Sequence, residues 1–447
     1  MRILVKDALL DGKPCSLLLE EGKISWIRDS AEEHPRREIA PAIPGPDPVP
    51  DTPRGTDSDV DRVLDARGLH AFPSFRNAHT HVAMVLFRGY GDDMPLMDWL
   101  RTRIWPAEAR LTAEDVYHGA RLGIVEMIRS GTTFFNEMYW HRDAIERAVQ
   151  ELGVRAVLGG ILLDLGDPEA LEAQQEELEH LARNAPRTGR VKVALAPHSI
   201  YMVPPHVLER VGELARKHDL LVHIHLSETE DEVRTCLEAN GCRPAIHLQR
   251  TGLLGPHLVA AHGQFLDDSE LELFGEAGAT IVTNPTANLK LATGGIFPYA
   301  AARRAGVRVC LGTDGAASNN NLDLVEEMKM AALVQKHREA DATVLPAEEA
   351  LALATSNPAG LFESASGTLA PGEPADLVLA DFSSPGTQPV HDPISTLVYA
   401  ASGRCVRTTI CGGRVLMHEG RIEVCDESEV VAEAVKVARR VTQPERS

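Results

Sequence analysis

From residue 72 onward, short apolar runs alternate with longer amphipathic stretches, and this alternation restricts the fold more than any other feature of the chain. The apolar runs end near residues 79, 137, 164, 198, 225, 262, 284 and 314. Most are separated by stretches with helical periodicity, at residues 113–130, 140–152, 169–184, 205–218, 230–240, 269–275 and 322–337. Strands that alternate with helices form parallel sheets, and eight such units are typical of a closed barrel. The sequence therefore predicts the α/β class, with a (β/α)8 TIM barrel over residues 72–360.

Both ends of the chain predict further strands outside this barrel. Before it, apolar and polar residues alternate at residues 2–6, 16–20, 23–27 and 63–66. After it, a helix at 347–355 precedes strand-like runs at 377–380, 396–400, 408–410 and 414–416. We expect these strands to pair in a small β-sandwich domain built from residues 1–71 and 361–425, with a terminal helix and tail at 426–447. Residues 30–61 are rich in proline and acids, which predicts a long surface loop or a disordered segment.

Charge and cysteine content narrow the possible partners and compartment. The formal net charge of −20 argues against nucleic acid or an anionic membrane as a partner, because phosphate groups attract basic surfaces. The seven cysteines are odd in number and form no CxxC pair, which favours a reducing compartment. No secretion signal or membrane-spanning run is visible. We therefore expect a cytoplasmic protein, and a homo-oligomer whose order the sequence leaves open.

Polar residues gather where the predicted barrel strands end. Five of the eight strands end in such residues: His79 and His81 on the first, His198 on the fourth, His225 on the fifth, His262 on the sixth and Asp314 on the eighth. Barrel enzymes place their chemistry at the carboxyl ends of the strands, whereas the opposite end serves stability. A single histidine there is more often a structural residue. Together, these residues indicate a metal site.

The spacing of the histidines suits a catalytic divalent metal. His79 and His81 lie two residues apart on a strand, so their side chains point to one face. A histidine of the fifth strand adds a third nitrogen, and Asp314 adds a carboxylate, which leaves a position for water. We expect His225 to be this ligand because it lies nearer the carboxyl end, whereas His223 lies one layer deeper. Zinc suits these ligands best, and iron, manganese and cobalt stay open.

Two further residues are placed to assist catalysis by an activated water. Glu228, on the loop that leaves the fifth strand, can carry a proton to the substrate ring or leaving group, as a glutamate does in zinc nucleobase deaminases of other folds. His262 can orient the attacking water, and Asp314 can accept its proton. Related two-metal hydrolases bridge their ions with a lysine at the end of the fourth strand, whereas Lys192 begins that strand here. This predicts one metal ion and favours deamination over cyclic-amide hydrolysis.

Several short stretches together carry a family resemblance. They are residues 79–81, 84, 88–89, 92–93, 99–100, 196–199, 225–229, 261–262, 284–291, 312–320, 367–372 and 375–378. They are similar to motifs of the metal-dependent amidohydrolase superfamily, in the branch of methylthioadenosine/S-adenosylhomocysteine deaminases and 5′-deoxyadenosine deaminases. The resemblance implies metal ligation by His79, His81, His225 and Asp314, and proton transfer by Glu228 and His262. It also implies that Glu108 binds ribose hydroxyls, that His198 contacts the nucleoside and that Trp99 helps to wall the pocket.

One departure from the family bears on the substrate. Members that bind S-adenosylhomocysteine place arginines after the third strand to hold the amino-acid carboxylate. Residues 157–167 contain no arginine and include Asp164 and Asp167, and Arg155 lies too early to substitute. We therefore expect hydrolytic deamination of methylthioadenosine, 5′-deoxyadenosine or adenosine, rather than of S-adenosylhomocysteine, to the inosine analogue and ammonia.

Three alternatives stay open at this point. The same chemistry could act on another ring, such as guanine, cytosine or a triazine. A catalytically inert barrel could serve as a scaffold, but this predicts loss of the ligand residues, and all of them are present. A nucleic-acid editing deaminase would need a basic surface, which the acidic composition opposes.

Overall fold

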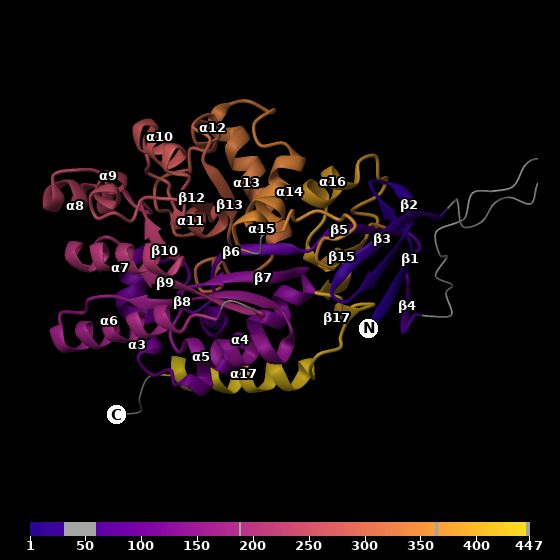
Figure 1. Ribbon diagram of the computed structural model, residues 1–447, viewed down its shortest axis with the longest axis horizontal. Helices are drawn as coiled ribbons and strands as arrows, with labels where there is room; N and C mark the ends of the chain where they lie inside the picture. The colour runs from indigo at the N-terminus through magenta and orange to yellow at the C-terminus, as the bar shows by residue number, and fades with distance from the viewer. Residues whose placement is uncertain (31–59, 187–188, 363–364, 444–447) are drawn as a thin grey trace, which may run out of the picture.

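The structure is a computed structural model that describes residues 1–30, 60–186, 189–362 and 365–443 (Figure 1). It contains two separate sheets, one parallel and one mixed. The parallel sheet lies at the centre of the larger body, and the mixed sheet combines indigo strands from the start of the chain with yellow segments from its end (Figure 1). The loop predicted over residues 30–61 lies almost entirely outside the described residues.

The parallel sheet is the predicted barrel. Its strands are β6 (Phe75–His81), β7 (Thr132–Glu137), β8 (Arg155–Leu162), β9 (Val191–Pro197), β10 (Leu221–Leu226), β11 (Leu258–His262), β12 (Thr280–Thr283), β13 (Arg308–Leu311) and β14 (Asp314–Gly315). They pair in chain order from β6 to β13, and β14 pairs with β6. Because β14 follows β13 after two residues, the two act as one interrupted eighth strand that closes the circle. The predicted α/β barrel is thus confirmed.

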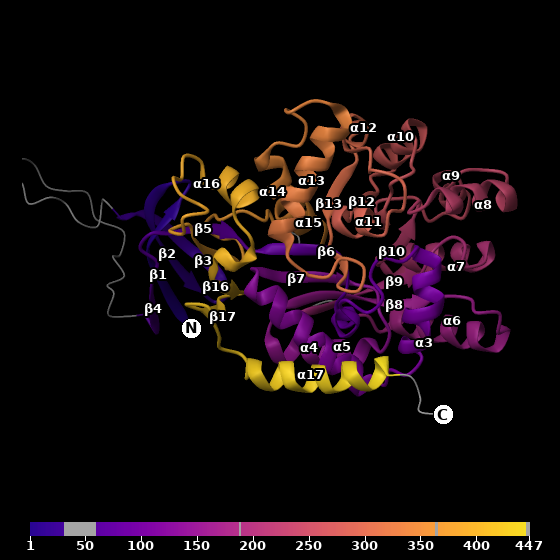
Figure 2. The same cartoon turned by 180° about the vertical axis from the view of Figure 1, so that it is seen from behind.

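Helices cover the outside of the barrel, as the periodicity predicts (Figures 1 and 2). They are α4 (Ala113–Arg129), α5 (Arg142–Leu152), α6 (Pro168–Arg183), α7 (Pro205–His218), α8 (Glu230–Asn240), α9 (Pro244–Arg250), α10 (Asp268–Ala277), α11 (Pro285–Lys290), α12 (Tyr299–Arg304), α13 (Leu324–Glu339), α14 (Ala347–Ala354) and α15 (Ser356–Phe362). Side-chain caps explain several of the helix starts. Thr112 and Asp115 form a capping box at α4, and the Asp267 carboxylate accepts the Glu270 N–H at α10.

An irregular segment joins β6 to α4 and bears on the site below. It contains η2 (Val82–Phe87), α2 (Leu96–Trp99), the π-helical turn η3 (Leu100–Ile104) and α3 (Trp105–Glu108). The residues of η2 are all buried. The turns that follow are short, and short helices depend on contacts with the rest of the protein for their stability.

The mixed sheet is built from both chain ends, as predicted. Its strands are β1 (Arg2–Leu10), β2 (Lys13–Glu20), β3 (Lys23–Asp29), β4 (Arg62–Asp65), β5 (Leu69–Pro73), β15 (Leu377–Asp381), β16 (Val406–Cys411), β17 (Arg414–His418) and β18 (Arg421–Ile422). The sheet has a hydrophobic core of its own, to which residues such as Leu17 and Leu377 contribute from the two ends. The apolar run at 69–75 divides at Ser74, so that β5 belongs to this sheet and β6 to the barrel.

The strand expected at residues 396–400 is wrong, because this run is helical. Asp392 accepts the Ser395 N–H and begins α16 (Pro393–Ser395), which continues into η4 (Thr396–Ala400). Leu397 and Val398 are buried, and η4 packs against α13 and α14. Burial of this apolar face against helices outweighs the local strand propensity.

A last helix, α17 (Glu427–Thr442), returns from the mixed sheet to the barrel and packs along α4 (Figure 2). Its range lies within residues 426–447, where the sequence analysis expects a terminal helix and tail. Within the described ranges, no helix has the length and apolar character that crossing a membrane requires.

Candidate metal centre and active site

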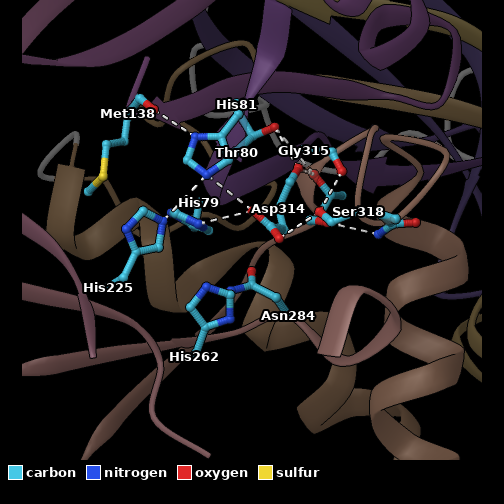
Figure 3. Close-up of polar contacts among 12 residues, drawn as sticks. His79, Thr80, His81, Met138, His225, His262, Asn284, Asp314, Gly315 and Ser318 are labelled. Carbon is cyan, nitrogen blue, oxygen red and sulfur yellow. Dashed lines mark hydrogen bonds and ion pairs between the residues drawn. The ribbon is translucent and has the colours of Figure 1, made fainter. Parts of the chain in front are cut away.

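The polar residues predicted at the strand ends meet at one end of the barrel (Figure 3). His79 and His81 come from β6, His225 from β10 and Asp314 from β14. The Nε2 atoms of His81 and His79 lie 3.2 Å and 3.4 Å from Asp314 Oδ1. His225 Nε2 lies 3.4 Å from His81 Nε2. Four donor atoms from distant parts of the sequence therefore converge on one point.

Contacts behind the rings turn these nitrogens toward that point. The Nδ1 atoms of His81 and His225 donate to the backbone carbonyls of Met138 and His198, at 2.6 Å and 2.9 Å. A neutral imidazole that donates from Nδ1 carries a lone pair on Nε2, which is the form that binds a metal. His79 Nδ1 lies 2.8 Å from His223 Nε2, so His223 is the deeper residue that the sequence predicts.

The fit to a metal can be tested on the buried atoms themselves. His79 Nε2 is buried and has no hydrogen-bond partner among the described residues. A buried polar atom without a partner is costly unless something else occupies its lone pair. Because this atom faces a carboxylate and two further imidazoles, the donor set fits a divalent cation with nitrogen and oxygen ligands.

Electrostatics give three of the four groups the protonation state that a cation requires. Burial lowers the pKa of His79 to about 3 and holds the pKa of His225 well below its usual range. Burial alone would raise the pKa of Asp314, but the adjacent His79 and His81 side chains hold it well below its usual range. His81 differs: burial lowers its pKa, yet Asp314 outweighs burial and raises it to about 9. Metal binding must therefore release a proton from His81.

Asp314 is held in an unusual backbone conformation. Its φ is +59°, in the left-handed region that non-glycine residues seldom adopt. The Ser318 hydroxyl donates to Asp314 Oδ2 at 2.6 Å, and Thr80 Oγ1 donates to the Asp314 carbonyl at 3.0 Å. These contacts leave Oδ1 directed at the histidines (Figure 3).

Glu228 and His262 lie beside this cluster. His262 Nε2 is 4.0 Å from Glu228 Oε2, and both side chains are largely buried. The Asn288 side-chain amide donates to His262 Nδ1 at 2.9 Å, and Asn284 supports it at 3.4 Å. An accepting Nδ1 places the proton of the neutral ring on Nε2, the opposite form to that of His81. Burial raises the pKa of Glu228, which favours its protonated form.

The peptide unit of Glu228 is held from two sides. Glu232 accepts the N–H groups of Ser227 and Glu228 with its two carboxylate oxygens, at 2.8 Å and 2.9 Å. On the other side, Gln264 Nε2 donates to the Glu228 carbonyl at 3.2 Å. Glu228 lies beyond the end of β10, so these contacts supply the rigidity that a strand would otherwise give.

The three residues with implied substrate roles occupy different surroundings. His198 lies against His225, with ring centroids 4.7 Å apart, and burial lowers its pKa to about 4. Glu108 Oε1 accepts the Tyr139 hydroxyl at 2.7 Å, and the Tyr139 ring is 6.2 Å from that of His81. Trp99 is only 5% exposed and belongs to the hydrophobic core.

Sequence reasoning missed four residues that hold this site: Glu137, Tyr139, Glu232 and Asn288. Glu137 accepts the backbone N–H groups of Val82 and Met138, and so joins the ends of β6 and β7. Each lies at or just beyond the carboxyl end of a barrel strand or in the next helix, and two carry a further sequence signal. Asn288 belongs to the family-like stretch 284–291, and Glu232 stands three residues after the helix-capping Thr229.

Two basic residues lie at the opposite end of the barrel, as the sequence predicts. Lys192 Nζ contacts the carbonyl of Phe362, in α15. Arg155, the first residue of β8, pairs with Asp376 beside the mixed sheet. Neither residue can bridge metals or bind a substrate at the carboxyl ends of the strands.

Comparison with known proteins agrees with this geometry. Residues 71–416 match the amidohydrolase family. The chain belongs to this family. It is 49% identical to a 5′-deoxyadenosine deaminase of Methanoregula boonei over 85% of this chain and 86% of that protein. It is 42% identical to 5-methylthioadenosine/S-adenosylhomocysteine deaminase 1 of Archaeoglobus fulgidus, over 86% of this chain and 90% of that protein.

A solved structure extends the likeness to the whole fold. An adenosine deaminase from Xanthomonas campestris with bound zinc matches 98% of both chains, with a TM-score of 0.86 and 33% identity. The family, the mixed sheet from both termini and the His/Asp groups that can hold a metal together support a hydrolytic aminohydrolase.

Proposed function

We propose that this protein deaminates an adenosine-type nucleoside, adding water to the purine and releasing the inosine analogue and ammonia. The observation that carries the proposal is the convergence of three imidazole nitrogens and the Asp314 carboxylate beside Glu228 and His262. The names of the relatives support the same reaction class.

We assign one divalent metal ion to the cluster, held by His79, His81, His225 and Asp314. Zinc suits this set of nitrogen and oxygen donors best, and the similar adenosine deaminase structure contains zinc. When bound, such a metal supplies an activated water at neutral pH.

The residues around the ion divide the proton transfers. Glu228, with its raised pKa, donates a proton to the ring nitrogen next to C6 as water adds there. Asp314 accepts the proton of the water, which then reaches the amino group as it leaves as ammonia. His262 donates a hydrogen bond from Nε2 and orients the water. The hydroxyl left on C6 gives its remaining proton back to Glu228 as the carbonyl forms, so Glu228 is protonated again for the next cycle. The balance is one water consumed and one ammonia released.

Three residues account for binding of the nucleoside. We assign the ribose hydroxyls to Glu108, whose position is fixed by the Tyr139 hydroxyl. His198 contacts the nucleoside from the wall next to His225. Trp99 supports the wall from within the core.

The surroundings of residues 163–167 favour an uncharged group at the 5′ position. Leu165 is 76% exposed there, between Asp164 and Asp167, and no arginine lies within residues 157–167. A carboxylate in this place would meet two acidic side chains without a basic partner. We therefore propose methylthioadenosine, 5′-deoxyadenosine or adenosine as substrate, and S-adenosylhomocysteine as a poor one.

An absorbance assay tests the reaction and the substrate choice together. Metal-analysed enzyme is given adenosine, methylthioadenosine, 5′-deoxyadenosine and S-adenosylhomocysteine in parallel. We expect the adenine-to-hypoxanthine change with the first three and little with the fourth. Rapid turnover of S-adenosylhomocysteine would overturn the argument from the missing arginine. No change with any of them, with metal bound, would redirect the search to guanine, cytosine and triazines.

A pair of variants tests the role of Glu228. Glu228→Gln should lose at least about 100-fold in kcat and keep its metal, because it removes only the proton carrier. Glu230→Gln, on the exposed start of α8, is the matched control and should retain activity. Equal activity of the two variants would remove Glu228 from the mechanism.

A further inference from the structure

We infer that Arg110 is a positioning residue for Glu108 and that it acts through the C-terminal helix α17, which thereby sets the affinity for the nucleoside. The inference rests on the proposed role of Glu108 in ribose binding. It concerns a helix that lies beyond the region matching the family, which ends at residue 416.

Helix α17 is fastened along the outside of the barrel. It runs beside α4, and its end lies close to α3 (Figures 1 and 2). Its buried side chains recur every three or four residues and form one apolar face: Val430, Ala434, Val437 and Val441. Arg129 pairs with Glu427 at its start, and Arg440 pairs with Asp115 near its end.

The end of α17 holds the segment that joins β6 to α4. Arg110 donates to the Val441 carbonyl from Nε at 2.8 Å and also from Nη2. The Tyr90 hydroxyl donates to the Thr442 carbonyl at 3.4 Å. The last carbonyls of a helix have no partner within it, so they are free to accept such donors. The two anchors lie on either side of α2, η3 and α3.

The anchor at Arg110 lies next to Glu108. Helix α3 has four residues, follows a π-helical turn and ends at Glu108. The N–H of Arg110 donates to the Ala107 carbonyl at 3.1 Å, and Leu111 N–H donates to the Glu108 carbonyl at 2.9 Å. One turn of helix has little stability of its own, so its position depends on contacts at its edges.

Glu108 is thus held from two directions. At the carboxyl ends of the barrel strands, the Tyr139 hydroxyl donates a hydrogen bond to the Glu108 carboxylate. Outside, the guanidinium of Arg110 ties the same turn to the end of α17. Without the contact between Arg110 and Val441, the turn that carries Glu108 should shift, and the hydrogen bond from Tyr139 should not be enough to hold it. The reacting groups lie on other elements, so binding should suffer and chemistry should not.

Steady-state kinetics of full-length, metal-loaded Arg110→Met tests this separation. The substitution removes the donors and keeps an apolar stem. We expect KM for the best adenosine-type substrate to rise about tenfold, equivalent to about 1.4 kcal/mol of binding, with kcat within about twofold. Arg110→Lys should recover part of the affinity, because its ammonium can still reach the Val441 carbonyl.

The matched control is Arg129→Met, which breaks the pair with Glu427 at the far end of the same helix. It should lower the melting temperature as Arg110→Met does, but leave KM unchanged. An unchanged KM in Arg110→Met, or an equal rise in both variants, would overturn the inference.

Hydrogen exchange supplies a readout that needs no substrate. In the metal-loaded, full-length protein, amides of residues 96–110 should exchange faster in Arg110→Met than in the wild type or Arg129→Met. If they do while no nucleoside is deaminated by the wild type, the anchoring holds and the proposed function fails. Unchanged exchange in Arg110→Met would refute the positioning role, whatever the activity.

Discussion

The histidines at the carboxyl ends of the barrel strands fall into two groups, which differ in the ring nitrogen that donates a hydrogen bond to, or accepts one from, the protein behind it. His81 and His225 donate from Nδ1 to backbone carbonyls, so that Nε2 can bind a metal, in His81 once it has lost the proton that its raised pKa of about 9 retains. His262 accepts at Nδ1 from Asn288, which leaves a proton on Nε2. The contact behind each ring thus separates the proposed ligands from the proposed hydrogen-bond donor, although the side chains are chemically identical.

The hydrogen bonds between Glu232 and the backbone before it give a prediction about the position of Glu228. Glu232→Gln replaces one carboxylate oxygen by an amide, so one of the N–H groups of Ser227 and Glu228 loses its acceptor. Glu228 should then shift, and kcat should fall about 10- to 100-fold while the metal content per chain stays the same. Kinetics and metal analysis of the same preparation check this. Glu230→Gln, exposed on the same helix, serves as the control. Equal kcat values for the two variants would contradict the role of Glu232 in holding Glu228 in place.

At the scale of elements, the interrupted eighth strand brings Asp314 to the histidines. Gly312 lies between β13 and β14, in the gap between Asn284 and β6. A Cβ there would approach the Asn284 side-chain oxygen and would lie 2.8 Å from the His79 carbonyl oxygen. A larger residue must therefore displace β6, the strand that carries His79, or the Asn284 side chain.

Substitution of Gly312 should reduce the amount of bound metal, whereas the barrel should stay folded. Gly312→Ala should push His79 away from Asp314 and lower the bound metal well below one ion per chain. Metal analysis after dialysis measures this, with circular dichroism to check that the barrel persists. Gly360→Ala in α15 has open space around its Cβ and should keep full metal occupancy. Full occupancy in Gly312→Ala as well would mean that the strand can adapt.

Helix α13 carries a buried acid whose titration should be visible in stability. Glu327 accepts Asn319 Nδ2 at 2.6 Å and Thr286 N–H at 3.3 Å, and burial raises its pKa from 4.5 to about 7. Between these values the native chain holds a proton that the unfolded chain has lost. The contribution of Glu327 to the free energy of unfolding is therefore greatest below pH 4.5 and falls as the pH rises toward 7.

Urea unfolding at pH 5, 6 and 7 measures this contribution. Glu327→Gln, a neutral mimic of the protonated acid, should reduce the fall by up to about 1.4 kcal/mol per pH unit relative to the wild type. The exposed neighbour Glu326→Gln should follow the wild type. Parallel wild-type and Glu327→Gln profiles would show that Glu327 ionises in the native protein as it does in the unfolded chain.

The elements also show how far the sequence could predict the structure. The barrel and the convergence of His79, His81, His225 and Asp314 follow from local periodicity, because residues two apart on a strand share a face. The helical run at 396–400 could not be foreseen, since its burial against α13 and α14 is a tertiary effect. The spacing of Thr229 and Glu232 predicts a helix start, but not that the Glu232 carboxylate would accept the N–H groups of Ser227 and Glu228 rather than that of Thr229.

At the scale of the whole molecule, the chain ends meet in the mixed sheet and the last helix returns to the barrel (Figure 2). The two sheets join at a buried charge cluster. Asp376, just before β15 and only 2% exposed, contacts Arg76 of β6 at 3.3 Å and Arg155 of β8. Its other oxygen accepts the Gly412 N–H at 2.6 Å. One carboxylate thus links two barrel strands to the turn between β16 and β17.

Removal of the Asp376 charge should destabilise the contact between the two sheets and leave the proposed metal site unchanged. Asp376→Asn deprives two guanidinium groups of the anion that they share, and breaking a buried ion pair costs about 3 to 5 kcal/mol. The melting temperature should fall clearly, whereas metal content and KM of the folded protein should stay unchanged, because the cluster lies at the opposite end of the barrel. Asp65→Asn, which breaks the exposed pair with Arg67, is the control and should change stability little. Equal melting temperatures for Asp376→Asn and the wild type would mean that apolar packing, rather than this charge cluster, joins the two sheets. A selective loss of metal in Asp376→Asn would mean that the cluster also stabilises the carboxyl ends of the barrel strands.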